Sequence, residues 1–153
     1  MTDRSRFAGV ARRMLGGGVT LAAMTAACAT YWPTLTGSST RTRGDAFTCS
    51  MDQLKELGYT PRTWNEREGS IDAQRINRDA SGRLPEEQQE VDKLLVQTKG
   101  NGERGSTIEV RTETVLRRYT RAGWVEDGRP VSPAAQQAGR ALLDRCAGPP
   151  ASG

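Results

Sequence analysis

The stretch TIEVRTETVLRRY, residues 107–119, decides the fold class because its side chains alternate in character along the chain. Every second position holds an apolar residue or a threonine: Ile108, Val110, Thr112, Thr114 and Leu116. Successive side chains of a β-strand point to opposite faces, so this pattern predicts a long strand with one buried and one solvated face. Such a strand is typical of an antiparallel sheet with one face packed on the core.

A hairpin is predicted upstream of this strand. The segments from Tyr59 to Asn65 and from Ser70 to Asn77 read as extended, and the four residues between them end in Gly69. Glycine can take the left-handed conformation that a tight turn of this length needs. Alternation places Ile71 and Ala73 on the same face, as a half-buried strand requires.

Two helices are predicted at the ends of this region. In the first, Asp45 is the expected N-cap, and Gly58 ends an apolar pattern with helical spacing: Phe47, Met51, Leu54 and Leu57. In the second, Ser132 is the expected cap of a helix that begins at Pro133, with one apolar side: Ala135, Ala138, Leu142 and Cys146.

The segment between hairpin and long strand is less clear. Pro85 opens a run with acidic residues in its first turns and with Val91, Leu94 and Leu95 on one side, which predicts a short helix. A strand over residues 93–98 remains open, because three consecutive apolar residues are too few to decide. Residues 98–106 are rich in glycine and predict a loop. Trp124 is placed in an extension of the long strand, beyond a bulge.

Together these elements predict an α+β fold, with an antiparallel sheet of three or four strands and helices packed on one face. The expected organisation is an export signal at residues 1–27, a cysteine with a flexible tether at 28–44, the α+β domain at 45–147 and a disordered tail at 148–153. The tether is expected from its Thr, Ser, Gly and Arg content, which is too polar to pack.

The first 27 residues carry most of the excess positive charge. Four arginines and one aspartate give them a net charge of +3, which leaves 18 basic and 17 acidic residues from Cys28 onward out of totals of 22 and 18. A nearly neutral mature chain without a basic stripe disfavours a nucleic-acid partner. The uncharged apolar stretch at 14–27 is short for a bilayer span, which needs about 20 residues, and is typical of a signal peptide.

This stretch ends in Met24-Thr25-Ala26-Ala27-Cys28, which resembles the lipobox of bacterial envelope lipoproteins, with Thr25 where leucine is usual. The resemblance implies cleavage before Cys28, a diacylglycerol thioether on its sulfur, and acylation of its amine, for example with palmitate. It also implies a membrane anchor facing the periplasm, with the outer membrane favoured over the inner. The segment from Phe47 to Ile71 is similar in general pattern to small lipoprotein domains, a likeness that carries no catalytic residues.

Two other interpretations of the leader stay open. One is an ordinary secretory signal cleaved near Ala27, with Cys28 incidental. The other is an uncleaved single span over residues 7–30, which would make the protein a subunit of a membrane complex. The pair Arg12-Arg13 leaves the export route, general secretory or twin-arginine, undecided.

The chain has three cysteines. If Cys28 is lipidated, Cys49 and Cys146 remain as an even pair near the two ends of the domain, and an oxidising envelope would allow a disulfide between them. Two free thiols in a reducing compartment are the alternative. The chain has no histidine and no Cys-x-x-Cys spacing, so we expect no metal site and no cofactor.

We expect a non-enzymatic binding or scaffolding module rather than an enzyme. The carboxylate pairs Glu66/Glu68 and Glu86/Glu90 lie in a predicted turn and a predicted helix start, and they leave a carboxylate-dependent cell-wall hydrolase as the weaker alternative. The candidate partner-binding residues are Trp64 and Trp124, each beside charged residues. The expected partner is an envelope protein or a cell-wall component.

An exposed Trp64 or Trp124 competes with burial in the core, which is the commoner place for tryptophan in a small domain. The arginine cluster Arg117, Arg118 and Arg121 could meet an anionic surface, although a solvated strand end is the preferred explanation.

Overall fold

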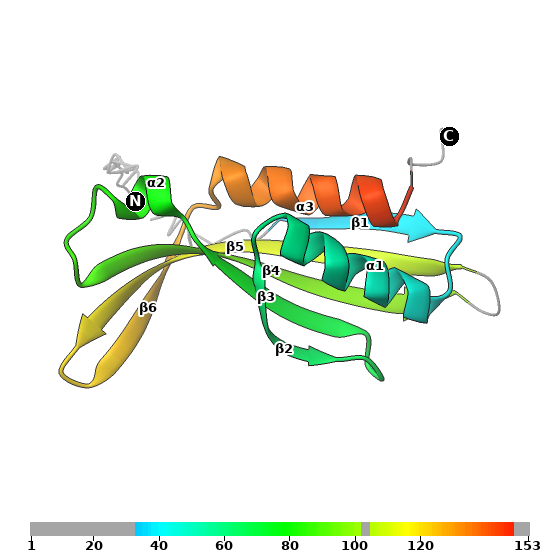
Figure 1. Ribbon diagram of the computed structural model, residues 1–153, viewed down its shortest axis with the longest axis horizontal. Helices are drawn as coiled ribbons and strands as arrows, with labels where there is room; N and C mark the ends of the chain where they lie inside the picture. Colours follow the sequence, from blue (N-terminus) through cyan, green and yellow to red (C-terminus); the bar gives the residue numbers. More distant parts are fainter. Residues whose placement is uncertain (1–32, 102–104, 149–153) are drawn as a thin grey trace, which may run out of the picture.

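The computed structural model describes residues 33–101 and 105–148 and has the α+β architecture predicted from the sequence (Figure 1). In chain order the elements are β1 (Thr34–Ser39), α1 (Arg43–Glu56), β2 (Thr60–Asn65), β3 (Ser70–Ile76), α2 (Arg78–Ser81), β4 (Gln88–Gly100), β5 (Ser106–Thr120), β6 (Gly123–Arg129) and α3 (Pro133–Cys146). The strands form one antiparallel sheet of six, more than the three or four expected.

The long strand β5 is central to the sheet. Its neighbour on one side is β4, and the order continues through β3 to the edge strand β2. Its other side is divided between two short strands: β1 pairs with residues 106–111, and β6 pairs with residues 114–120. The strand predicted at 107–119 is therefore confirmed, and its two halves have different neighbours.

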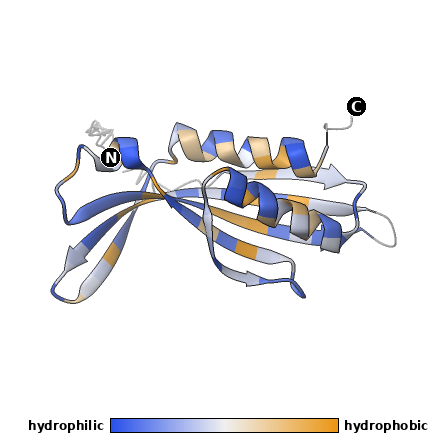
Figure 2. Ribbon diagram, viewed as in Figure 1, coloured by the Kyte–Doolittle hydropathy of each residue, from blue (hydrophilic) through white to orange (hydrophobic). Residues whose placement is uncertain are grey.

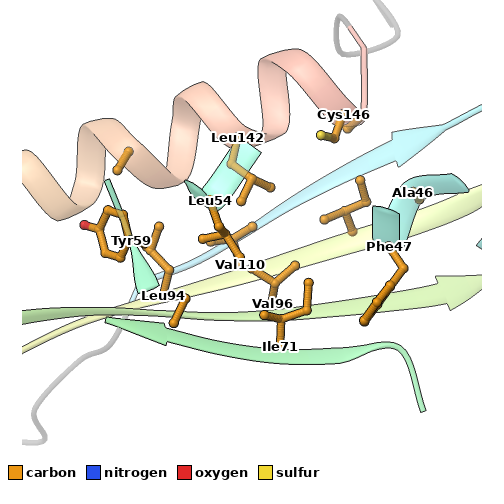
Figure 3. Close-up of a cluster of buried hydrophobic side chains, with 14 residues drawn as sticks. Ala46, Phe47, Leu54, Tyr59, Ile71, Leu94, Val96, Val110, Leu142 and Cys146 are labelled. Carbon is orange, nitrogen blue, oxygen red and sulfur yellow. The ribbon is translucent and has the colours of Figure 1, made fainter. Parts of the chain in front are cut away.

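Helices α1 and α3 cover one face of the sheet, over the half of β5 that pairs with β1 (Figure 1). The largest side chains buried between the layers come from both helices and from the central strands, and they include Leu54, Leu142, Leu94 and Val110 (Figure 3). Helix α3 approaches β5 closely at Gly139, where a Cβ would lie 2.9 Å from Thr112 Cγ2. The apolar alternation of β5 forms the floor of this core.

The predicted hairpin is present as β2 and β3, with Trp64 opposite Ile71. Gly69 takes a φ of +74°, and a Cβ there would lie 2.3 Å from the Thr98 carbonyl oxygen. The turn glycine thus meets two demands, a left-handed backbone and a close approach by β4. The predicted cap of α3 is also present, because the Ser132 side chain accepts from the Ala135 N–H.

The helix predicted from Pro85 onward is wrong, because residues 88–100 form β4. Hydrogen-bonded neighbours on both sides, β3 and β5, hold this segment extended. From residue 92 onward its buried side chains fall on alternate positions, Asp92, Leu94, Val96 and Thr98, and the preceding Val91 is buried as well. The strand alternative over residues 93–98 was the correct one, and tertiary pairing outweighed the helix-start signals.

Two boundaries near the start of the domain also need correction. Residues 34–39, predicted as tether, form the edge strand β1, whose pairing with β5 does not require an apolar sequence. Helix α1 begins at Arg43, and its cap is Thr42, which accepts from the Asp45 N–H, so Asp45 lies in the first turn.

Trp124 lies in a separate strand, β6, after a turn that returns the chain along β5.

The hairpin of β5 and β6 projects beyond the helix layer, at the left of Figure 1. Figure 2 shows hydrophobic bands on α1 and α3 and on the strands beneath them, whereas the hairpin is mainly hydrophilic. The molecule therefore has a half covered by α1 and α3 and a half that these helices leave uncovered.

Candidate functional site

Both candidate tryptophans are exposed. The exposed fraction is 60% for Trp64 on β2 and 51% for Trp124 on β6. The two strands lie on opposite sides of β5 in the sheet, so the structure does not bring these side chains together into one site. Each has to be assessed in its own surroundings.

Trp124 is part of an aromatic pair at the end of the β5–β6 hairpin. It lies directly opposite Tyr119, with the ring centroids 5.3 Å apart and the planes at 65°. This edge-to-face arrangement is favourable for two rings, and Tyr119 is itself 61% exposed. Tyr119 was not predicted as a site residue, because only the register of the hairpin identifies it as the partner of Trp124.

Ion pairs behind the aromatic pair hold the hairpin. Arg117 donates to Glu126 at 2.7 Å, and Arg118 donates to Asp127 at 2.6 Å. Lys93 of β4 also donates to Glu126. Burial alone would raise the pKa of Glu126, but hydrogen bonds from Lys93 and Arg117 lower it below its usual range. Two of the three clustered arginines are therefore engaged within the hairpin.

A cluster of polar side chains is buried where the two halves of the sheet meet. Asp92 of β4 is fully buried, and its Oδ1 accepts from Thr114 and from Ser132, each at 2.8 Å. Ser132 is also the cap of α3, so the carboxylate joins β4, β5 and the start of that helix. A negative charge near a helix N-terminus is favourable, which supports a positioning role for Asp92.

Arg75 of β3 is the cation nearest to this carboxylate, with Nη2 at 3.6 Å from Asp92 Oδ2. The guanidinium lies 4.7 Å from the centre of the Tyr59 ring and donates to the Leu57 carbonyl oxygen. The Tyr59 hydroxyl is buried without a hydrogen-bond partner among the described residues, and burial raises the pKa of Tyr59 to about 12. In Figure 3 this hydroxyl lies at the margin of the apolar cluster.

A shallow cavity of about 710 Å³ opens beside Arg75. Its wall includes Arg62, Arg75 and Arg78 with Asp79, at the part of β3 that extends beyond β2. Arg75 already faces Asp92, so one of the three cations is partly neutralised. The cavity is open to solvent, and the residues that line it include no histidine, cysteine or serine.

Of the residues that form the buried cluster around Asp92, only Thr114 and Ser132 were predicted from the sequence to have a structural role. Asp92 gave one usable signal, since it occupies a core position in the alternation of residues 91–98. A carboxylate at such a position predicts a buried polar cluster once the segment is known to be a strand.

The carboxylates considered for hydrolysis do not converge. Glu66 and Glu68 lie in the exposed turn between β2 and β3, and Glu86 is exposed in the loop before β4. Glu90 accepts from the Asn77 side chain at 2.9 Å. Their surroundings are those of solvated turns and a strand end.

Cys49 and Cys146 form a disulfide, as predicted. The bridge joins α1 to the last residue of α3, and the Cys146 carbonyl accepts from the Ser39 hydroxyl at the end of β1. The disulfide therefore closes the helix-covered half at the end opposite the β5–β6 hairpin. Cys28, the predicted export signal and most of the predicted tail lie outside the described residues.

The comparisons with known proteins give no family: no family model matches the chain, and no curated protein matches it. Among residues 33–101 and 105–148, no helix is long and apolar enough to cross a membrane.

Proposed function

We propose that the protein is a lipid-anchored module of the bacterial cell envelope, which binds an envelope protein or cell-wall component and catalyses no reaction. The observation that carries this proposal is the pairing of Cys49 with Cys146. A disulfide of this kind persists in an oxidising compartment, which supports export. It accounts for two of the three cysteines of the chain, and the third, Cys28, lies in the lipobox-like motif.

The binding role is supported by the exposed aromatic residues. A tryptophan that stays accessible in a small domain offers a large apolar surface with a polar N–H, and such residues often anchor partners. Trp64 and Trp124 both meet this description.

Intact mass measurement of the protein from the membrane fraction tests the proposal. We expect a chain that begins at Cys28 and carries the added mass of a diacylglycerol and an amide-linked acyl group. The matched variant Cys28→Ser should lack this mass and leave the membrane fraction or retain its leader. A wild-type chain with an intact Met1 or Thr2 terminus, or one cleaved near Cys28 without acyl mass, would contradict the proposal.

A further inference from the structure

The end of the β5–β6 hairpin carries exposed apolar surface that the fold itself does not use. Three of the five large hydrophobic residues that the described part of the chain exposes lie here, namely Tyr119, Trp124 and Val125. Arg121 lies in the turn between the strands and is also exposed. A group of aromatic rings beside arginine is the combination found where proteins meet the headgroup region of a bilayer.

The start of the described chain connects this hairpin with the proposed anchor. Thr34 lies opposite Arg111 of β5, and the Pro33 carbonyl accepts from the Thr112 N–H. Since β1 and β5 are antiparallel, Pro33 lies on the side of Thr34 that is nearer to the hairpin. Six residue steps separate Cys28 from Thr34, which limits their separation to about 20 Å.

The turn between β5 and β6 can reach the surface of a bilayer in which an acylated Cys28 is anchored. Thr120, the last residue of β5, lies nine positions beyond Arg111, which corresponds to about 30 Å along an extended strand. An anchor up to about 20 Å from Thr34, in that direction, comes within about 10 Å of the level of the turn. An acylated Cys28 and the aromatic pair can therefore reach the same membrane interface.

The net charge of the hairpin would not by itself favour contact with a membrane. Residues 117–129 hold four arginines against Glu126 and Asp127, a net charge of +2, but the neighbouring loop contributes Glu86 and Glu87. The Tyr119 N–H donates to the Glu87 carbonyl oxygen, so that loop lies beside the aromatic pair. The rings, rather than the net charge, distinguish this end of the molecule.

We infer that the aromatic end of the β5–β6 hairpin contacts the surface of the bilayer that holds the Cys28 anchor. This inference rests on the proposed lipidation of Cys28. It orients the domain, with the hairpin toward the membrane and the disulfide end toward the periplasm, where a partner has access. Trp124 then contacts lipid, and Trp64 is left to bind the partner. Trp64 lies away from the bilayer, because its register partners lead to Val110, ten residues along β5 from Thr120.

Quenching of tryptophan fluorescence by brominated acyl chains tests this orientation on the full lipidated protein in phosphatidylcholine and phosphatidylglycerol vesicles. Two single-tryptophan proteins are compared. One carries Trp32→Phe and Trp64→Phe and retains Trp124, and the matched control carries Trp32→Phe and Trp124→Phe and retains Trp64. Both retained residues are exposed and of one type, so the comparison isolates position, and substitutions at exposed sites preserve folding.

We expect brominated vesicles to reduce the Trp124 emission by roughly half relative to unbrominated vesicles, and to leave the Trp64 emission nearly unchanged. Equal emission of Trp124 in both vesicles would overturn the inference, as would equal quenching of the two proteins. Intact mass of the same samples separates this outcome from failure of lipidation. Quenching of Trp124 in a chain without acyl mass would support the hairpin contact and refute the anchor, whereas acylation without quenching would refute the hairpin contact alone.

Discussion

The two halves of strand β5 are held by different kinds of interaction. Alternate residues of 106–112, namely Ser106, Ile108, Val110 and Thr112, are buried beneath helices α1 and α3, with β1 beside this half of the strand. Residues 114–120 pair with β6, and ion pairs such as Arg117–Glu126 hold this half while Tyr119 and Trp124 stay exposed. The comparison shows that one continuous strand carries the stability of the domain at one end and an accessible surface at the other.

Removal of the disulfide should produce the largest effect on the helix-covered half. Closing a loop across a separation of 97 residues restricts the unfolded chain. We expect Cys49→Ser/Cys146→Ser to lower the free energy of unfolding by about 4–5 kcal/mol, measured by urea denaturation. A loss below about 1 kcal/mol would mean that the helices hold this half without the bridge.

Truncation of one large side chain in each half gives a direct contrast. Leu142 is fully buried between α3 and the sheet, so Leu142→Ala should cost about 3 kcal/mol through lost burial and a residual cavity. Trp124→Ala removes a larger side chain from an exposed position and should cost less than about 1 kcal/mol. Equal losses in urea denaturation would contradict the division of the molecule into two halves.

Asp92 tests the junction between the halves. Asp92→Ala removes the acceptor of both the Thr114 and the Ser132 hydroxyl and leaves these groups buried, so we expect a loss of about 2–3 kcal/mol. Asp92→Asn retains an acceptor oxygen and is the matched control, with a smaller loss. Thermal denaturation compares the two, and an unchanged transition in Asp92→Ala would exclude a structural role for the carboxylate.

Alkaline pH should have a smaller effect on the unfolding free energy, through Tyr59, whose ring lies beside Arg75. The pKa of Tyr59 is about 12 in the folded protein against 10.0 for the unperturbed side chain, so the unfolded chain loses this proton first. The contribution is fully present below pH 10 and is lost between pH 10 and 12, on the order of 2 kcal/mol. Tyr59→Phe should flatten the fall in unfolding free energy over this range. A slope identical to that of the wild type would refute the assignment.

The parts of the fold that the sequence predicted are those in which local pattern and tertiary structure agree. Residues 107–119 alternate in a sheet that needs alternation, Ser132-Pro133 caps a helix that is present, and Gly69 turns a real hairpin. The disulfide between Cys49 and Cys146 was predicted from the number of cysteines, because lipidation was already the expected role of the third, Cys28.

The errors arose where long-range contacts decide. Glu86 and Glu87 after Pro85 resemble a helix start, but pairing with β3 and β5 holds residues 88–100 extended. Residues 34–39 look too polar to pack, yet an edge strand needs only backbone hydrogen bonds to β5. Long-range contacts also decided which candidate residues could be predicted. Trp64 and Trp124 were predicted from their residue type. Tyr119 and Asp92 could be recognised only from the register of the strands.

The division of the molecule into a core end and a membrane-facing end is tested most directly by hydrogen exchange of the vesicle-bound protein that carries the proposed acyl groups on Cys28. The reference is the unlipidated chain, exported with an ordinary secretory signal in place of residues 1–28. We predict slower exchange over residues 117–129 in the vesicle-bound protein, with exchange over α3, residues 133–146, unchanged. Protection of α3, or no protection of the hairpin, would contradict the account.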